Sequence, residues 1–464
     1  MDQFSNRTFD EIEVGASESI THRLTATEVE GLSLVSGDVE SFHLDLEGKA
    51  SNGGPSAPGS AAIALISGLV NRRLPGPGSA IVGTHFVYRG RMHAGDTVTA
   101  SLTARSKDAA RGQIDFDCRV VHESGAVLVE GVATIAAPAK RIAYGDIATP
   151  AVILRRNDGI ARLLKKCETL EPVQCAVVHP CDRDSLLGAL EAAKHRLIVP
   201  VLVGPEAKIR SVAAEAGVSL AGYRIVSTEH SHAAAEVAVA LARSGEVEAL
   251  MKGSLHTDEL MAAVVSSTTG LRTERRISHV FVMDVPAYPR VLLITDAAIN
   301  IYPDLDCKVD ICRNAIYLAH VLGVPEPRVA ILSAVETINP KIESTLHAAA
   351  LCKMADRGQI TGGLLDGPLA FDNAISPEAA KTKNIVSPVA GQADILLVPD
   401  LESGNMVAKQ LTYLAGADGA GIVLGTRVPI VLTSRADSVR TRLASAAVMM
   451  LVAHDRRAML LPKT

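Results

Sequence analysis

Two kinds of hydrophobic periodicity follow one another along this chain, and the change between them near residue 140 constrains the fold more than any other feature. Between Thr97 and Ser106, and again between Gln113 and Val120, apolar and polar residues alternate. Alternation with period two predicts antiparallel strands with one face in water. After residue 150, short apolar runs alternate with amphipathic helical stretches, which predicts parallel strands covered by helices on both faces. A multidomain chain is therefore expected.

The N-terminal part combines these strands with one apolar helix. Residues 79–136 read as a meander of long strands, and the stretch from Ser60 to Val70 before it is apolar nearly all round. Such a stretch is expected to form a buried helix. A long antiparallel sheet wrapped around one buried helix is the hotdog arrangement, an α+β fold. We predict a hotdog domain over residues 1–137 and a linker over 138–150, where the periodicity is weak.

The C-terminal part, residues 151–464, is expected to be an α/β domain. One of its helices is predicted from His232 to Arg243, with Ser231 as N-cap and Gly245 just past the end. The predicted strands are 175–178, 198–203, 291–295, 329–333, 394–399 and 428–433.

Charge and composition argue against several classes of partner. Lys plus Arg is 46 and Asp plus Glu is 51, a net charge of −5, and no long basic run suggests nucleic-acid binding. The N-terminus does not resemble a signal peptide, and the apolar stretches near 57–70 and 443–453 are too short or interrupted to span a membrane. The seven cysteines show no CxxC pair and no zinc spacing. We therefore expect a cytoplasmic protein with reduced thiols and no metal site.

Asp38 and His43 form the first candidate site, because they can converge on one water if the loop between them curls. Hydration of a conjugated thioester needs a base for that water and hydrogen-bond donors for the enolate-like oxygen. Backbone N–H groups near Gly59, at the start of the buried helix, could donate to that oxygen. Spacing alone also allows an Asp that turns the loop beside a packed His.

The segments Ser36-Gly37-Asp38, His43-Leu44-Asp45 and Pro75-Gly76-Pro77-Gly78 resemble the MaoC-like (R)-specific enoyl-CoA hydratases over about residues 8–137. The resemblance implies that Asp38 and His43 are catalytic and that trans-2-enoyl-CoA is the substrate. Glu40-Ser41 replaces the family's Asn-Pro, and Pro58-Gly59 replaces its His-Gly. A non-catalytic module that binds acyl-CoA or holds an oligomer together therefore remains the alternative.

A strand, a polar turn and a helix from Val428 to Leu451 form the second candidate site. Ser438 is a natural N-cap there, and a helix N-terminus after a parallel strand binds anions. Arg435 offers a fork that matches phosphate oxygens, and Ser434 can donate to a phosphate or to a thioester oxyanion. The alternative is a capped helix start without a ligand.

Three more polar segments, 251–257, 295–304 and 366–374, stand at predicted strand ends. Each could be a simple loop rich in Gly and Asp. If the strand ends share one edge of the sheet, the segments would form one site with the Ser434 turn.

Together, in this order, these segments resemble the phosphate acetyl/butyryltransferase family over nearly all of 151–464. The resemblance implies reversible transfer of an acyl group between CoA and phosphate. It also implies two α/β/α lobes around a cleft, the first about 151–285 plus 423–464 and the second about 286–422. CoA, acyl-CoA and phosphate are then substrates, no tightly bound cofactor is needed, and a homo-oligomer is expected.

The family's motifs can be placed residue by residue. Thr441 stands where acetyl-specific members carry the Asp thought to act on the CoA thiol, so Asp437 or Asp296 is the expected base. A decarboxylating dehydrogenase of the isocitrate type is disfavoured, because no metal-binding aspartates or nicotinamide site can be assigned. Acyl chain length is left open. The implied catalytic residues are Ser434, Arg435 and one of the two aspartates, and the implied substrate-binding residues are Lys252, Gly253, His256, Thr257, Thr295, Asp372, Asn373 and Ser438.

Overall fold

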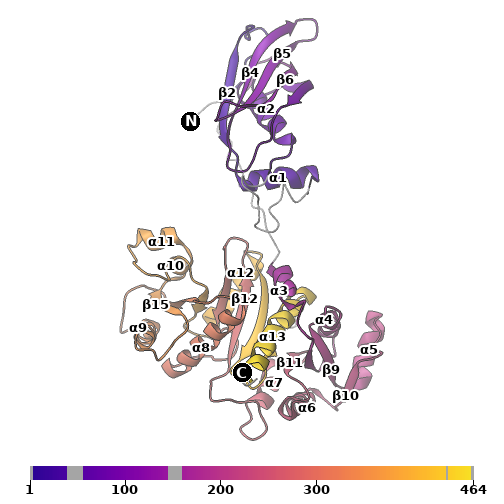
Figure 1. Ribbon diagram of the computed structural model, residues 1–464, viewed down its shortest axis with the longest axis vertical. Helices are drawn as coiled ribbons and strands as arrows, with labels where there is room; N and C mark the ends of the chain where they lie inside the picture. The colour runs from indigo at the N-terminus through magenta and orange to yellow at the C-terminus, as the bar shows by residue number, and fades with distance from the viewer. Residues whose placement is uncertain (1–3, 39–55, 145–158, 435–436, 461–464) are drawn as a thin grey trace. The chain divides into compact units, whose positions relative to one another are not determined.

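The computed structural model describes residues 4–38, 56–144, 159–434 and 437–460. The chain divides into two compact units, Met1–Arg155 and Arg156–Thr464. Each unit is considered by itself (Figure 1). Within the described ranges, no helix is long and apolar enough to cross a bilayer.

The N-terminal unit contains a five-stranded antiparallel sheet in the order β2-β4-β5-β6-β3. Alternate residues of β4, from Val98 to Ala104, are fully or almost fully buried, as period two requires. The meander predicted over 79–136 is confirmed for β4, β5 and β6, whereas β3 pairs with β6 at the edge of the sheet instead of with β4. The strands are β2 (Ser17–Arg23), β3 (Ala80–Tyr88), β4 (Thr97–Asp108), β5 (Gln113–His122) and β6 (Val127–Ala136).

One helix, α2 (Ser60–Arg72), packs on this sheet and buries Ile66, Leu69 and Val70 in the shared core. The buried helix and the hotdog arrangement are therefore confirmed by the structure. A second helix, α1 (Ala26–Ser36), begins with a capping box between Thr25 and Glu28 and ends at Gly37. Gly37 has φ 71°, a left-handed conformation that glycine adopts readily.

Part of the predicted linker is held on the N-terminal unit. β1 (Phe4–Ser5) pairs with β7 (Ala143–Tyr144). The Asn6 side chain donates to the carbonyl of Lys140 and accepts from the N–H of Ile142, both at 2.8 Å. Residues 145–150, the rest of the predicted linker, lie outside the described residues.

The C-terminal unit is built on one eleven-stranded mixed sheet, in the order β10-β9-β8-β11-β18-β17-β12-β13-β16-β14-β15. All six apolar runs predicted as strands are strands. The strands are β8 (Val173–Val178), β9 (Ile198–Gly204), β10 (Arg224–Ser227), β11 (Ala249–Lys252), β12 (Ser278–Asp284), β13 (Val291–Thr295), β14 (Arg328–Leu332), β15 (Leu364–Leu369), β16 (Ile395–Leu397), β17 (Asp418–Leu424) and β18 (Ile430–Val431).

Helices connect these strands, and one predicted helix start is wrong by one residue. The N-cap of α6 is His230, whose Nδ1 accepts from the N–H of Ala233, and Ser231 is the first helical residue. Gly245 ends α6 with φ 81°, as predicted. The helices are α3 (Gly159–Cys167), α4 (Arg183–Lys194), α5 (Glu206–Ala216), α6 (Ser231–Ser244), α7 (Thr257–Val264), α8 (Leu305–Val321), α9 (Glu343–Asp356), α10 (Phe371–Ile375), α11 (Pro377–Thr382), α12 (Leu401–Tyr413) and α13 (Val439–Leu460).

The two halves of this sheet run in opposite directions. β8, β9, β10, β11 and β18 are mutually parallel, and so are β13, β14, β15 and β16. Between them, β17 is antiparallel to both β18 and β12, and β12 is antiparallel to β13. The carboxyl ends of the two sets therefore point in opposite directions along the strand axis.

Apolar side chains cover both faces of the sheet. One face shares a single core with α3, α4, α8, α9 and α13, and Figure 1 shows α13 lying across that face. The other face carries two separate clusters, one with α6 and α7 and one with α10 and α12. Burial on both faces explains why these strands are continuous apolar runs. The division into two lobes around a cleft stays a prediction.

Candidate functional site

The carboxyl ends of β8, β11 and β18 bring the first group of predicted residues together. In the sheet, Lys252 lies beside Val178, and Met251 lies beside Val431. Lys252 is buried, and its Nζ is 3.3 Å from the carbonyl oxygen of Thr433. Lys252 thus joins the end of β11 to the turn that follows β18. We call this edge the lysine edge.

Gly253 fits only because it has no side chain. A Cβ there would lie 2.5 Å from the carbonyl oxygen of Val178 and 2.6 Å from that of His179. His256 is the exposed N-cap residue of α7, and half-buried Thr257 is its first helical residue. These positions place the N–H groups at the start of α7 at the lysine edge, where they can attract an anion.

The turn after β18 is held by its own hydrogen bonds. The N–H of Ser434 donates to Oδ2 of Asp437 at 2.6 Å, and the N–H of Asp437 donates to the Ser434 carbonyl at 3.2 Å. Ser438 Oγ accepts from the N–H of Thr441 at 3.2 Å, which confirms Ser438 as the cap of α13. Arg435 lies outside the described residues.

A buried arginine that was not predicted from the sequence donates two hydrogen bonds to this turn. Arg442 is 2% exposed, and it donates to Oγ1 of Thr433 at 2.7 Å and to the carbonyl of Ser434 at 2.9 Å. Burial lowers the pKa of its guanidinium from the usual value, although Asp182, Asp437 and Asp184 oppose that shift. Arg442 is the fourth residue of α13, and nothing in the local sequence distinguishes it from an exposed arginine on a helix surface.

The second group of predicted residues follows β13, in the set of strands that runs the other way. We call the carboxyl ends of β13 and β15 the aspartate edge. Thr295 is fully buried, and its hydroxyl donates to the carbonyl of His279 at 2.8 Å. Asp296 is 2% exposed, and its carboxylate accepts N–H groups of Ala298, Ile299 and Asn300 at 2.9 to 3.1 Å. The Asn300 side chain donates to the same carboxylate at 2.6 Å. Burial raises the pKa of Asp296 in spite of these four donors.

Asp372 and Asn373 also lie at the aspartate edge, after β15. Asn373 is fully buried and donates to Glu336, which also accepts from Lys383 at 2.5 Å. The exposed Asp372 is 3.4 Å from the Lys383 ammonium. The hydrogen bond from Lys383 lowers the pKa of Glu336.

The register of the sheet separates the two groups. Thr295 lies beside Val280, Val280 beside Ile422, Ile422 beside Val431, and Val431 beside Met251. Four strand spacings therefore lie between Thr295 and Met251, about 19 Å at about 4.8 Å each. The two residues are level in the sheet, and from there the chain continues in opposite directions along β13 and β11. Convergence of the two groups on one site stays a prediction, and an extended molecule would be needed to contact both.

An arginine-rich loop lies near the Asp296 turn and was also missed. Arg272, Arg275 and Arg276 line a cavity of about 440 Å³ together with Asn300 and Asp310. The Asn300 side chain, which binds Asp296, also donates to the carbonyl of Ile277 at 2.9 Å. The run RTERR is a short basic cluster in the sequence, and this cluster is the signal that could have indicated an anion site.

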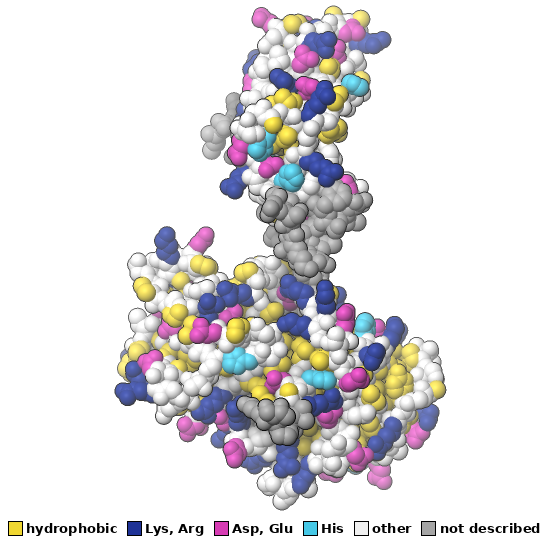
Figure 2. All heavy atoms as spheres, in the orientation of Figure 1, with side chains coloured by type: hydrophobic (Ala, Val, Ile, Leu, Met, Phe, Trp, Pro, Cys, Tyr) yellow, Lys and Arg dark blue, Asp and Glu magenta, His cyan; other side chains and the backbone are white. Residues whose placement is uncertain are grey.

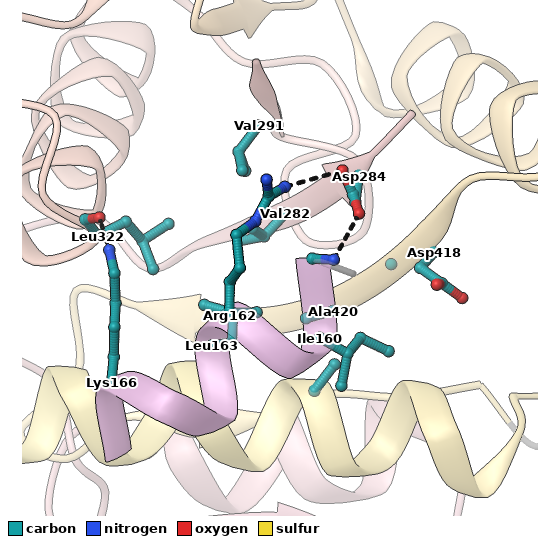
Figure 3. A pocket seen from close by; sticks show the side chains of 13 residues that line it. Ile160, Arg162, Leu163, Lys166, Val282, Asp284, Val291, Leu322, Asp418 and Ala420 are labelled. Atoms are coloured by element: carbon teal, nitrogen blue, oxygen red, sulfur yellow. Dashed lines mark hydrogen bonds and ion pairs between the residues drawn. The ribbon is translucent and has the colours of Figure 1, made fainter. Parts of the chain in front are cut away.

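A smaller and mostly apolar cavity of about 130 Å³ lies under α3, beside α13 (Figure 3). Its polar rim is occupied by internal pairs. Asp284 accepts from the N–H of Gly159 at 3.0 Å and lies 3.8 Å from Arg162, and Lys166 donates to the carbonyl of Leu322 at 2.6 Å. The rim thus joins α3 to the sheet and to the end of α8.

In the N-terminal unit, Asp38 is half-buried one residue after Gly37, and His43 lies outside the described residues. Gly59 precedes α2, and its carbonyl accepts from the Tyr88 hydroxyl at 3.3 Å. Among the described residues the Ser60 hydroxyl, at the first residue of α2, is buried without a hydrogen-bond partner. A groove of about 750 Å³ runs between α1, α2 and β2, and Leu24, Leu32 and Leu65 contribute to its lining.

The distribution of charged and metal-ligating side chains bears on possible ligands. The described residues contain no group of three His, Cys, Asp or Glu side chains placed to hold a metal ion. Figure 2 shows acidic and basic side chains interspersed over the visible face of both units.

Comparison with known proteins identifies the second unit. A family model described as "Phosphate acetyl/butaryl transferase" matches residues 231–450. The chain is 66% identical over 297 residues to the phosphate acetyltransferase of Rhizobium meliloti, which covers 64% of this chain and 94% of the relative. It is 42% identical over 294 residues to the phosphate butyryltransferase of Clostridium acetobutylicum, 63% of this chain and 98% of the relative.

A solved structure gives the same result. The branched-chain phosphotransacylase from Enterococcus faecalis V583 is 30% identical, with a TM-score of 0.54, over 61% of this chain and 99% of that one. Likeness of this extent, over the unit that carries the Ser434 turn and the lysine edge, shows that the chain belongs to the phosphate acetyl/butyryltransferase family.

Proposed function

We propose that the C-terminal unit transfers a short acyl group between CoA and phosphate, in either direction, and that the lysine edge holds the reacting groups. The observation that carries this proposal is the convergence of Lys252, the Ser434 turn and the start of α13 at the ends of adjacent strands. A buried ammonium, a serine hydroxyl and a helix N-terminus together suit an anion that is formed or released there.

The chemistry follows from the charges that change. In acyl-CoA synthesis the CoA thiolate attacks the carbonyl carbon of an acyl phosphate, and a tetrahedral oxyanion forms. Ser434 is proposed to donate to that oxyanion, while Arg435 and the N–H groups at the start of α13 hold the phosphate as it leaves. No redox step occurs, so we propose that no tightly bound cofactor takes part.

The aspartate edge is proposed to bind a remote part of CoA. CoA is an extended molecule with several phosphate groups, and the arginines around the 440 Å³ cavity offer forks that match phosphate oxygens. Thr295, Asp372 and Asn373 would then shape this end of the site without touching the reacting atoms. This arrangement fits two residue groups that lie about 19 Å apart along the sheet.

Phosphate-dependent release of free CoA from acetyl-, propionyl- and butyryl-CoA tests the proposal. We expect Arg435→Ala to lower kcat about 10²- to 10³-fold, the usual effect of removing a transition-state donor. Arg224→Ala is the matched control. Arg224 lies on β10, at the far end of the sheet, and forms an exposed ion pair with Glu246. If no acyl-CoA supports phosphate-dependent release by the wild type, the proposal is wrong. The ranking of the three substrates gives the chain length, and the 66% identity to an acetyltransferase favours acetyl-CoA.

For the N-terminal unit we propose hydration of trans-2-enoyl-CoA, with Asp38 and His43 as catalytic residues. The unpartnered Ser60 hydroxyl at the start of α2 and the groove beside α2 support a site that takes a polar head and an apolar chain. Loss of the enoyl absorbance of crotonyl-CoA measures the reaction. Asp38→Asn should abolish it and leave phosphate-dependent CoA release unchanged.

The second candidate role for this unit is a non-catalytic acyl-CoA-binding or assembly module. It is favoured by β3, an edge strand that exposes Val82, Val87 and Tyr88. An exposed edge strand with apolar side chains is a template for pairing with another strand. We propose a cytoplasmic homo-oligomer, and sedimentation of the wild type against Val82→Lys tests whether this edge pairs two copies.

A further inference from the structure

His179 is a residue at the lysine edge to which no role has yet been given. It follows the last residue of β8 and has φ 54°, in the left-handed region that non-glycine residues rarely adopt. Its neighbour across the sheet is the turn at Gly253 and Ser254, whose N–H groups donate to the carbonyls of Val178 and His179 at 2.9 Å. Two adjacent strand ends thus fix the backbone of His179 in a strained conformation, a feature that is enriched at functional sites.

Hydrogen bonds around Ser254 decide which imidazole nitrogen carries the proton. The Ser254 hydroxyl donates to the carbonyl of His179 at 3.1 Å and accepts the N–H of Cys181 at 3.2 Å. Nδ1 of His179 lies 3.3 Å from both the hydroxyl oxygen and the carbonyl oxygen of Ser254. The carbonyl oxygen of Ser254 can only accept, so this contact places the hydrogen on Nδ1. Nε2 is therefore the unprotonated nitrogen, as a general base requires.

The carboxylates expected to act on the CoA thiol already have other hydrogen-bond partners. Asp437 accepts the N–H of Ser434 within its own turn. Asp296 accepts four N–H groups and lies at the aspartate edge, away from Ser434. Thr441, which follows at the start of α13, offers only a hydroxyl. A base is still needed at the lysine edge.

We propose that His179 is a catalytic residue of the transferase and that its Nε2 takes the proton of the CoA thiol. This inference rests on the proposed function. β11 separates β8 from β18, so the strand ends that lead to His179 and Ser434 are two spacings apart, about 10 Å. A thiol between them can meet the imidazole on one side and an acyl carbonyl at Ser434 on the other.

The step is balanced. The S–H bond breaks as Nε2 takes the proton, the S–C bond forms, and the oxyanion then collapses with cleavage of the C–O bond to phosphate. The imidazolium returns the proton to the departing phosphate, so acyl phosphate and CoA become acyl-CoA and hydrogen phosphate. The reverse reaction uses the same steps in the opposite order.

Charged groups from three helices face this imidazole. Burial lowers the pKa of His179 below its usual value, and Lys208 on α5 lowers it further. Glu259 on α7 and Asp182 at the start of α4 oppose that shift, as does the hydrogen bond to Ser254. The lowered pKa favours the neutral ring, the form that a base needs.

The test is the pH profile of CoA acylation by acetyl phosphate, from pH 5 to 9, for the full-length wild type, His179→Asn and His195→Gln. Asparagine tolerates the left-handed backbone, so His179→Asn is expected to fold. His195→Gln is the control, because His195 is an exposed histidine at the end of α4 that pairs with Glu191. We expect kcat to fall about 10²- to 10³-fold in His179→Asn, the usual contribution of a general base. The fall of rate at acidic pH that we expect for the wild type should be lost.

Each other outcome has a defined meaning. If the wild type acylates CoA and His179→Asn keeps kcat within about threefold, with the same acidic limb, His179 is not the base. An equal loss of kcat at every pH, with the acidic limb retained, would point to a structural role and also overturn the inference.

If His179→Asn does not fold, Ser254→Ala provides the test. Ser254→Ala removes one acceptor at Nδ1 of His179 and so raises the fraction of the tautomer that carries its hydrogen on Nε2, which cannot act as a base. We expect kcat to fall, and an unchanged kcat would contradict the inference. A wild type without any activity would contradict the proposed function itself.

Discussion

The lysine edge and the aspartate edge of the sheet contain similar residue types but use them differently. At the lysine edge, hydroxyl, imidazole and ammonium groups lie at the ends of parallel strands, next to the starts of α7 and α13. At the aspartate edge, the carboxylates of Asp296 and Glu336 are held by amide N–H groups and by Lys383. Carboxylates with such partners define loop shape, whereas a strained histidine beside a buried lysine suits proton transfer. The comparison is consistent with our proposal that chemistry takes place at the first edge and binding or support at the second.

The first prediction tests the lysine edge through Arg442. Arg442→Met removes the donor to the buried Thr433 hydroxyl and one of the two donors to the Ser434 carbonyl, which keeps the N–H of Asp437. We expect kcat to fall about 10²-fold, because misplacement by about 1 Å has that effect, and the free energy of unfolding to fall by about 1–3 kcal/mol. Steady-state kinetics and urea unfolding measure both quantities.

Arg440→Met is the matched control for Arg442→Met on the same helix. Arg440 pairs with Asp418, and its side chain is half exposed, so its removal should change stability by less than about 1 kcal/mol. Equal losses of kcat in the two variants would show that general damage to α13, not the support of the Ser434 turn, explains the result.

The second prediction tests whether the aspartate edge is structural. Asp296→Asn places an NH₂ group against the Asn300 side chain and its N–H, where the wild type has an acceptor. We expect the free energy of unfolding to fall by about 1–3 kcal/mol and kcat to fall less than about tenfold. A drop in kcat of more than about 100-fold, with an unchanged urea midpoint, would make Asp296 the base and would break the comparison between the edges.

Several features of this molecule could be predicted from its sequence. The apolar runs that became β8, β9 and β13 are buried on both faces, so their strands have a clear local signal. The buried helix α2 and the cap at Ser438 were likewise visible, because apolar residues on every side and an N-terminal serine act locally.

What the sequence could not provide was strand direction. β12 and β17 reverse the second half of the sheet, and β17 begins with Asp-Gly-Ala-Gly, which has a weak strand pattern. Because of the reversal, the chain leads into Asp296 and into Ser434 in opposite directions, although both residues follow predicted strands. Arg442 and His179 gave no signal, because their roles depend on partners that are distant in sequence or on a backbone angle.

The smallest predicted effect concerns the pH dependence of folding stability at the aspartate edge. Glu336 accepts from Lys383 and Asn373, and the Lys383 hydrogen bond, the largest cause, holds the pKa of Glu336 below its usual range. A carboxyl whose pKa is lower in the folded state stabilises the fold above its unfolded pKa of about 4.3, and that contribution is lost as the pH falls through the folded value. Glu336→Gln should therefore lower the free energy of unfolding by about 0.5–1 kcal/mol at pH 7, since Lys383 is partly exposed. The difference from wild type should shrink as the pH is lowered through 4.

Urea midpoints at pH 7 and at lower pH, with Glu378→Gln as control, test this prediction. Glu378 lies in the first turn of the short helix α11, next to the same cluster in sequence. If Glu336→Gln keeps its stability but raises the KM for CoA, the Glu336, Asn373 and Lys383 cluster contacts substrate. The part of the aspartate edge that follows β15 would then bind substrate as well. The two edges would differ in which part of CoA each one binds.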